Sequence, residues 1–349
     1  MTKGRAHSIQ NDMSRRLTPT LLARPAAHAA RVIASEQLTH VAVQLDAFLA
    51  DESVGFHDLR VALRRLRTWV RAFQPEVEDT VRKKARRALR KLAHATNAPR
   101  DAESTLEWVA TQTELAPRER AGVRYFADRL EHEYNEGDAH ARERLRRKLP
   151  KLIATLTKQL QTYRIKYDID QPVAATAMAR VTRDTLVAQA ERFERAVDRI
   201  ESPDDSGHIH RVRIAAKRLR YVLETIDDPA AAKLAKQLTE VQDRLGISHD
   251  MHAIVNRIVR ELGEVSARDA RVAALHALVP DSDRDRARLP AIRPGLTALA
   301  IRARAADRNA FDAFRADWTA ERIAATIAEI ATLGDDLLAH SQHRTRRAT

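Results

Sequence analysis

Two segments of the chain repeat one pattern of basic and apolar residues, and this repetition restricts the fold more than any other feature. The first, HDLRVALRRLRTWVRAF, covers residues 57–73, and the second, HIHRVRIAAKRLRYVLETI, covers residues 208–226. When His210 is aligned with His57, basic residues coincide at four further positions and apolar residues at five. The chain is therefore predicted to contain an internal duplication with an offset of about 150 residues.

Each repeated segment is amphipathic on a helix in which every residue turns by about 100°. In the first segment five basic residues share a stripe about 80° wide, Arg65 lies off it, and leucines and Val70 occupy the opposite side. In the second segment the stripe is shorter, because Glu224 stands where Arg71 stands in the first. The stripe residues are His57, Arg60, Arg64, Arg67 and Arg71 in the first segment and His210, Arg213, Lys217 and Arg220 in the second.

The composition predicts a nearly all-α chain, because helix-forming residues are abundant and strand formers are few. The sequence divides into an N-terminus of residues 1–20 expected to be mobile, a first helical repeat (21–167), a join (168–175), a second repeat (176–339) and a basic tail (340–349). Periodicity and helix breakers predict helices at 26–50, 56–73, 76–95, 101–113, 117–136 and 139–165, then at 175–201, 209–226, 229–245, 249–264, 267–279, 295–306 and 309–338.

The positive charge of the chain is concentrated in two windows. The net charge is +13; residues 57–100 contribute +9, from 13 Lys or Arg against 4 acids, and residues 210–249 contribute +3, from 8 against 5. Such clustering favours a polyanionic partner. The helix predicted at 76–95 adds to the first window, and Lys84, Arg87 and Lys91 line one of its flanks, with Lys233 and Lys236 as counterparts in the second half.

Phosphate groups suit these stripes, because Arg binds phosphate oxygens with two hydrogen bonds and Lys acts as a point charge. Reading of duplex DNA favours Asn and Gln beside Arg, and binding of single strands favours stacking aromatic residues. The stripes contain neither, and aromatic residues make up only 4% of the chain. A phosphate chain without bases is therefore the preferred partner, and nonspecific nucleic-acid binding is the alternative.

The motif pair HDLRVALRRLR and HRVRIAAKRLRY, with the later segments PRD and QDRLGISHD, resembles the two halves of a CHAD domain, a histidine-containing all-helical domain associated with inorganic polyphosphate. The resemblance covers about residues 20–340. It implies two pseudo-symmetric four-helix-type bundles forming one domain, and a basic central channel or cleft that binds polyphosphate without catalysis through the stripe residues. It also implies a stand-alone module located in the cytoplasm on polyphosphate granules.

The histidines offer three readings. His57 and His210 could cap their helices, or they could donate to phosphate and become charged on binding, so that affinity rises as the pH falls from about 7 to 6. In a third reading, His249, Asp250 and His252 would bind a metal of a helical phosphohydrolase. The matching residues of the first half are Arg100, Asp101 and Glu103, which disfavours that reading. We expect no metal, cofactor or catalytic residue.

The sequence lacks cysteine and lacks long apolar segments, and both absences restrict the kind of protein that is expected. The chain has no cysteine, which excludes disulfides and thiolate metal sites. It has no run of about 18 apolar residues and no apolar leader segment, so no membrane association or export is expected.

Overall fold

The computed structural model describes residues 16–50, 52–161, 176–278 and 291–348, and within these ranges all regular elements are helices. The predicted all-α fold class is thereby confirmed. The helices are α2 (Pro19–Leu22), α3 (Ala26–Ala50), α4 (Glu52–Ala72), α5 (Gln74–Val77), α6 (Lys83–Ala95), α7 (Asn97–Ala110), α8 (Arg120–Gln161), α9 (Met178–Val197), α10 (Ser206–Leu223), α11 (Pro229–Leu278), α12 (Arg293–Asp317) and α13 (Ala320–Ala348).

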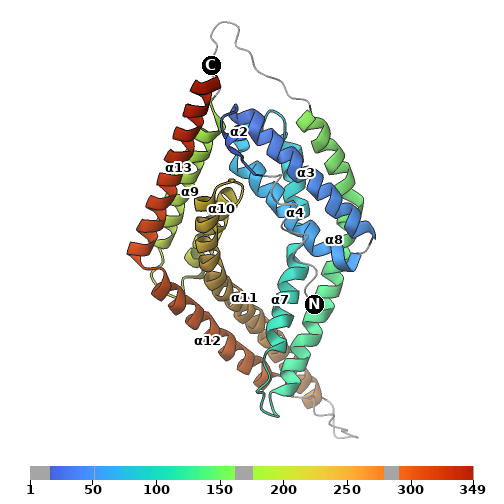
Figure 1. Cartoon of the computed structure of the whole chain (residues 1–349). Coiled ribbons are helices and arrows are strands. Elements are labelled where there is room, and N and C mark those ends of the chain that lie inside the picture. Colours follow the sequence, from blue (N-terminus) through green and yellow to red (C-terminus); the bar gives the residue numbers. More distant parts are fainter. Residues whose placement is uncertain (1–15, 51, 162–175, 279–290, 349) are drawn as a thin grey trace.

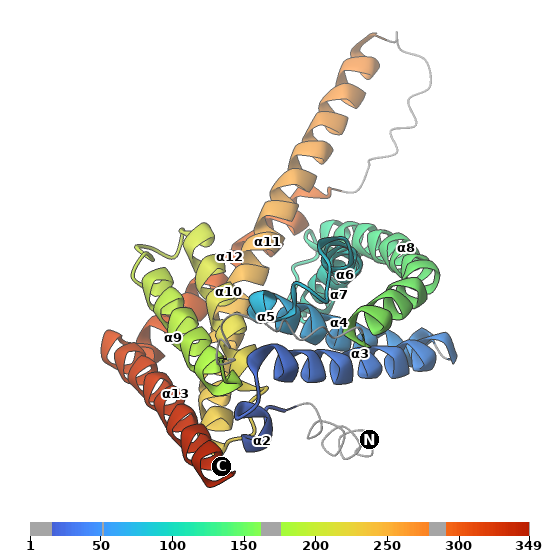
Figure 2. The same ribbon diagram turned by 90° about the horizontal axis from the view of Figure 1, so that it is seen from above.

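The helices form two groups, which pack together through α3 against α9, through α4 against α10 and through α8 against α12. Figure 1 shows α3, α4 and α8 on one side and α9, α10 and α13 on the other, with α12 crossing back towards α7. One hydrophobic core runs through both groups, and a second, smaller core joins α7, α8, α11 and α12. Seen from above, the C-terminal part of α11 projects beyond the rest of the molecule (Figure 2). The internal duplication itself stays a prediction.

The apolar side of α4 lies where the helical periodicity places it. Leu59, Leu63, Leu66 and Val70 are all buried in the larger core, and each contributes about 1.5–3 kcal/mol by leaving water. Trp69 adds a directional contact, since its indole Nε1 donates to the backbone oxygen of Ala30 on α3 at 2.9 Å. The basic side of α4 is thereby turned away from α3.

The apolar side of α10 is buried in the same way, through residues such as Val212, Leu219 and Leu223. The start of this helix is set by Asp205, whose carboxylate accepts a hydrogen bond from the backbone N–H of His208 at 3.3 Å. An acidic N-cap satisfies a backbone donor that the helix leaves unpaired. The two helices with the repeated pattern are thus fixed by their apolar sides and present their basic sides outward from the core.

Several predicted helix boundaries are wrong because local breakers are weaker than tertiary packing. The segments predicted as helices 117–136 and 139–165 form the single helix α8, which continues through Pro150. The three helices predicted between 229 and 279 form the single helix α11, although Gly246 and Gly263 lie within it. A glycine in a helix costs only about 1 kcal/mol, which packing overrides.

Other boundaries differ by a turn or more. The helix α4 begins at Glu52, where a turn was predicted, and the predicted helix 76–95 is divided into α5 and α6. The division allows Val81 to be buried completely, and the backbone N–H of Arg82 then donates to the side-chain oxygen of Gln159 at 3.3 Å. The predicted basic tail is helical through Ala348. The join at 168–175 and the first 15 residues lie outside the described ranges.

Two glycines allow α8 and α12 to cross in direct backbone contact. A Cβ atom added to Gly122 would lie 2.0 Å from the backbone oxygen of Ile292, and one added to Gly295 would lie 2.1 Å from the backbone oxygen of Glu119. Only glycine permits such an approach. This crossing attaches α12 to the first group of helices. None of the described helices combines the length and apolarity needed to cross a membrane.

Candidate functional site

The basic sides of α4 and α10 meet around Tyr221. The guanidinium carbon of Arg64, on α4, lies 5.9 Å from the centre of the Tyr221 ring, and that of Arg220, on α10, lies 4.9 Å from it. The tyrosine is 8% exposed, so its ring is a buried partner of both cations. We use the name cationic cluster for six side chains of these two helices, Arg60, Arg64, Arg67, Arg213, Lys217 and Arg220.

Charge crowding in the cationic cluster is strongest at Lys217. Burial, followed by the positive charges of Arg64 and Arg213, lowers the pKa of the Lys217 amine to about 7. Burial, followed by the charge of Arg64, also lowers the pKa of Arg60, and burial, followed by the charge of Arg71, lowers that of Arg67. These shifts show that cations from both helices lie within mutual electrostatic range. An anion placed among them would relieve the repulsion.

Polar atoms beside the cationic cluster lack hydrogen-bond partners within the described part of the chain. They are the Nε atom of Arg64, the hydroxyl of Tyr221 and the Nδ1 atom of His210, each removed from solvent. Buried polar atoms in folded proteins are almost always paired, and an unpaired one costs about 1–3 kcal/mol. Because water does not reach these atoms, a phosphate oxygen would contact them only after the neighbouring side chains move.

Two carboxylates lie at one end of the cationic cluster, Asp101 on α7 and Asp250 on α11. Loss of water around them raises the pKa of both, although both side chains keep some contact with solvent. The positive charge of Arg213 acts against this net rise at both carboxylates, whereas the negative charge of Asp101 adds to the rise at Asp250. The two aspartates that align between the halves of the sequence therefore lie close enough to interact. They limit the positive charge at this end of the site.

The two stripe histidines have different surroundings. His57 is exposed on α4, whereas His210 is half-buried on α10 with its ring centre 4.6 Å from that of His249 on α11. Burial, followed by the charge of Arg213, lowers the pKa of His210, and the same two causes lower that of His249 to about 4. Both rings of this pair are therefore neutral at pH 7. An anion beside His210, or a lower pH, would favour its charged form.

The remaining candidates lie outside the cationic cluster to different degrees. Arg71 is exposed and continues the α4 stripe beside Arg67. On α6, the exposed residues Lys84, Arg87 and Lys91 carry the flank selected from the sequence, but it is Arg90 of this helix whose charge acts on Arg67. Lys233 is turned towards α13, where its amine lies 3.1 Å from the carboxylate of Glu329.

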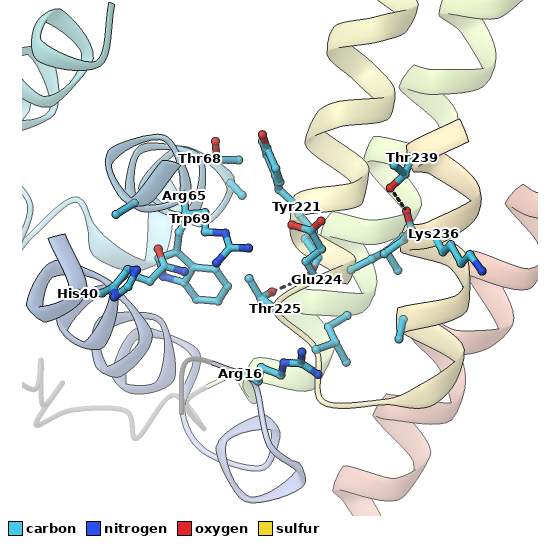
Figure 3. Close-up of a pocket in the computed structure, with 18 of the residues that line it drawn as sticks. Arg16, His40, Arg65, Thr68, Trp69, Tyr221, Glu224, Thr225, Lys236 and Thr239 are labelled. Carbon is cyan, nitrogen blue, oxygen red and sulfur yellow. Dashed lines mark hydrogen bonds between the residues drawn. The ribbon is translucent and has the colours of Figure 1, made fainter. Parts of the chain in front are cut away.

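Lys236 lines a separate cavity of about 480 Å³ between α3, α4, α10 and α11. Figure 3 shows Arg65 and Trp69 on one wall of this cavity and Glu224 and Thr225 on the other. Acidic residues contribute as much to its lining as basic ones, which makes it unlike the cationic cluster. The three acids are Glu224, Glu240 and Asp243.

Tyr221 and Glu224 connect the cavity with the cationic cluster. Tyr221 borders both, and Glu224 lies 3.4 Å from the Nε atom of Arg220 as an ion pair. Arg220 also donates to the hydroxyl of Thr239 on α11 at 3.3 Å. Part of the positive charge of α10 is thus neutralised inside the protein. Tyr221 lies beside the basic stripe of α10, at about 20° from His210 on the helical wheel, but the repeated pattern did not single it out because Thr68 stands at the matching position of the first segment.

The metal-binding reading finds no support in the geometry. Among the residues that the structure describes, no three His, Asp or Glu side chains converge as a set that could hold a metal ion. His249, Asp250 and His252 do not form such a set, although they are close in sequence. The arginines around Asp250 would also repel a divalent cation.

The sequence pattern of the CHAD domain matches residues 32–259. The chain belongs to the CHAD domain family. Its helices superpose on two solved structures at low sequence identity, which supports the shared fold. The crystal structure of the CHAD domain from the plant Ricinus communis has a TM-score of 0.55 at 20% identity, covering 79% of this chain and 93% of that one. PptA from Streptomyces chartreusis has a TM-score of 0.60 at 17% identity, covering 84% of this chain and 99% of that one. No curated protein matched.

Proposed function

We propose that this CHAD protein binds inorganic polyphosphate, without transforming it, through the cationic cluster between α4 and α10. The observation that carries the proposal is the meeting of Arg64 and Arg220 at Tyr221, which joins the two repeated stripes into one site. Membership of the CHAD domain family supports a polyphosphate-related role. Binding of this kind would recruit the protein to polyphosphate granules in the cytoplasm.

The row of several positive charges in the proposed site fits an anion with repeating phosphate groups. A chain of phosphates offers oxygens to successive arginines along α4, and the exposed Arg71 continues this row within electrostatic range of Arg67 and of Arg218 on α10. Each charge-assisted hydrogen bond to phosphate contributes about 1.5–3 kcal/mol. Binding through many such contacts releases counterions, so the affinity should fall steeply as the salt concentration rises.

The position of Tyr221 favours polyphosphate over nucleic acid. Proteins that hold single strands stack bases on exposed aromatic rings. Here the ring of Tyr221 is buried and both neighbouring cations, Arg64 and Arg220, already lie near it. Tyr221 therefore offers no stacking surface beside the cationic cluster, whereas the cations proposed to bind phosphate are present.

The proposal is tested by removing four cluster charges at once and comparing the result with a matched change elsewhere. The variant Arg60→Ala, Arg64→Ala, Arg213→Ala, Lys217→Ala should lose binding of a fluorescent medium-chain polyphosphate by more than about 100-fold, since each lost contact costs about tenfold or more. Its helicity should persist by circular dichroism, because the apolar sides are unchanged. The control replaces four exposed cations near and on α8, namely Arg118, Arg124, Arg147 and Lys151, with alanine.

The control has the same net charge as the cluster variant, so similar losses in both would mean that only overall charge matters, and the proposed site would be wrong. Competition decides between the two ligand classes. Bound polyphosphate should resist DNA or RNA added at the same phosphate concentration. Displacement at that concentration would favour nucleic acid as the ligand.

A further inference from the structure

The cavity of about 480 Å³ between α3, α4, α10 and α11 begins one helical turn beyond the cationic cluster. Residues four positions apart lie on the same side of a helix, about 5.4–6 Å apart along its axis. On α4 the cavity residue Thr68 follows Arg64 at this spacing, and on α10 Tyr221 follows Lys217. Figure 3 shows Thr68 and Tyr221 at the same end of the cavity. A ligand longer than one helical turn can therefore reach the cluster and the cavity together.

The cavity is accessible from solvent. Ala232, Lys236 and Asp243 of α11 belong to its lining and are exposed. Its volume of about 480 Å³ lies in the range of about 300–1,000 Å³ that is typical of small-molecule sites. The cavity can thus admit a small molecule without rearrangement of the helices.

A phosphate chain alone does not suit this cavity, because the charges of its lining balance. The lining contains three Lys or Arg and three acids, namely Arg16, Arg65, Lys236, Glu224, Glu240 and Asp243. The carboxylates would repel phosphate oxygens. The row of positive charge on α4 continues instead through Arg67 and Arg71, which lie outside this lining. The cavity therefore suits a part of a ligand that carries no net charge.

The walls of the cavity combine apolar surface with hydrogen-bonding groups of both kinds. Trp69, Val222 and Ile226 contribute apolar side chains. Figure 3 shows the donor Arg65 on one wall and the acceptor Glu224 on the other. A hydrocarbon group would remove water from these polar groups without replacing its hydrogen bonds, and a sugar alone would leave the apolar surface uncovered. A nucleobase has apolar faces and carries both donors and acceptors along its edge, so it matches both kinds of surface.

We propose that the protein binds nucleoside polyphosphates, with the phosphates held by the cationic cluster and the nucleoside in this cavity. The placement of the phosphates rests on the proposed function, whereas the placement of the nucleoside rests on the cavity. Tyr221 borders both compartments, so the junction between phosphate and nucleoside would lie beside it.

The experiment compares ATP with tripolyphosphate, which has the same number of phosphates but no nucleoside. Titration calorimetry on the full chain, without divalent cations, should give ATP an affinity at least about fivefold higher, the low end of what contact with one base contributes. Tripolyphosphate carries at least as much negative charge as ATP, so charge alone cannot produce this preference. Equal affinities, or tighter binding of tripolyphosphate, would overturn the inference.

A pair of matched variants tests where the nucleoside lies. Ala232→Trp fills part of the cavity from α11, and Ala230→Trp makes the same change at an exposed residue of the same helix outside the lining. Once both variants are shown to be folded by circular dichroism, Ala232→Trp should lose the preference for ATP and keep its affinity for tripolyphosphate. Ala230→Trp should keep both. Equal losses of both ligands in Ala232→Trp would contradict the placement in the cavity.

Photolabelling locates the base directly. An azido-adenine analogue of ATP should label peptides that contain cavity residues such as Arg65, Trp69 and Lys236, and excess ATP should prevent the labelling. Mass spectrometry identifies the labelled peptides. Labelling confined to other parts of the chain would refute the placement of the nucleoside.

Failure of this inference and failure of the proposed function give different results. Tight binding of medium-chain polyphosphate, with no preference for ATP over tripolyphosphate, would refute only the inference. A preference for ATP that Ala232→Trp removes, in a protein that does not bind medium-chain polyphosphate, would uphold the inference and refute only the proposed function.

Discussion

The helices α4 and α10 carry the same sequence pattern, but they differ in how much of their positive charge is neutralised within the protein. On α4 the stripe consists of arginines with an exposed histidine at its start, and the end of the stripe at Arg71 is open to solvent. On α10 the central position is Lys217, with a pKa of about 7, and Arg220 is engaged by Glu224 and Thr239. The first stripe is therefore permanently charged, whereas the second is partly neutralised within the protein.

This difference indicates a division of roles within one site. Arginine keeps its charge at all physiological pH values, so α4 can supply affinity without depending on conditions. The α10 stripe contains groups whose charge responds to pH or to an arriving anion, namely Lys217 and His210. In the proposed site, the similar motif would provide a fixed binding surface on α4 and an adjustable one on α10.

The largest expected effect is a difference in the loss of polyphosphate affinity between paired substitutions on α4 and paired substitutions on α10. Arg60→Ala with Arg64→Ala should weaken polyphosphate binding by about 100-fold, since two charge-assisted contacts at about 1.5–3 kcal/mol are lost. Arg213→Ala with Arg220→Ala should weaken it by only about tenfold, because Glu224 already neutralises part of the Arg220 charge. Fluorescence anisotropy at fixed salt concentration measures both. Equal losses, or a greater loss on α10, would break the proposed division of roles.

An intermediate effect concerns the pH dependence that Lys217 confers. In the free protein the pKa of Lys217 is about 7, and a bound polyanion raises it, so binding takes up a proton above pH 7. As far as Lys217 is concerned, the affinity for polyphosphate should therefore be constant below about pH 7. Above pH 7 the affinity should fall by up to about tenfold per pH unit, until the pH reaches the pKa that Lys217 has in the bound protein. Any contribution of His210 would lie at lower pH.

The matched variant is Lys217→Arg, which keeps a positive charge over the whole range. Its affinity should stay nearly constant between pH 7 and 9, where that of the unaltered protein falls. Titration calorimetry in two buffers of different ionisation enthalpy would show the proton uptake directly. If the variant and the unaltered protein gave the same slope, Lys217 would not be the titrating group.

The sequence allowed the fold class to be predicted, together with the helix sides that carry the proposed site. Both follow from local periodicity: apolar residues such as Leu63 and Leu219 repeat every three or four positions, and burial of that side turns Arg64 and Lys217 away from the core. Because an α-helix has a fixed geometry, the side on which a residue lies can be read without knowing its neighbours. The meeting of the two stripes was a prediction from the family resemblance.

What could not be predicted depends on contacts between distant segments. The direction of Lys233 towards Glu329 is set by the packing of α11 against α13, which no local pattern reports. Helix lengths were wrong because Gly137 and Gly246 look like breakers in isolation, but the helices α8 and α11 continue through them. Tyr221 was missed because the repeated pattern was traced through charged residues alone, and its burial depends on the packing of α10 against α4.

The smallest expected effect tests whether the internal neutralisation on α10 is the cause of the difference. Glu224→Gln removes the negative charge beside Arg220 while keeping the side-chain size, so Arg220 becomes available to phosphate and affinity should rise by about two- to fivefold. The control Glu240→Gln makes the same charge change at the same cavity, but Glu240 pairs with Arg322 on α13 at 2.7 Å, away from the cluster. A gain in the first variant and not in the second would identify the Glu224 carboxylate as the group that restrains the α10 stripe. Equal gains in both would instead mean that overall charge governs the affinity, and the contrast between α4 and α10 would then need another cause.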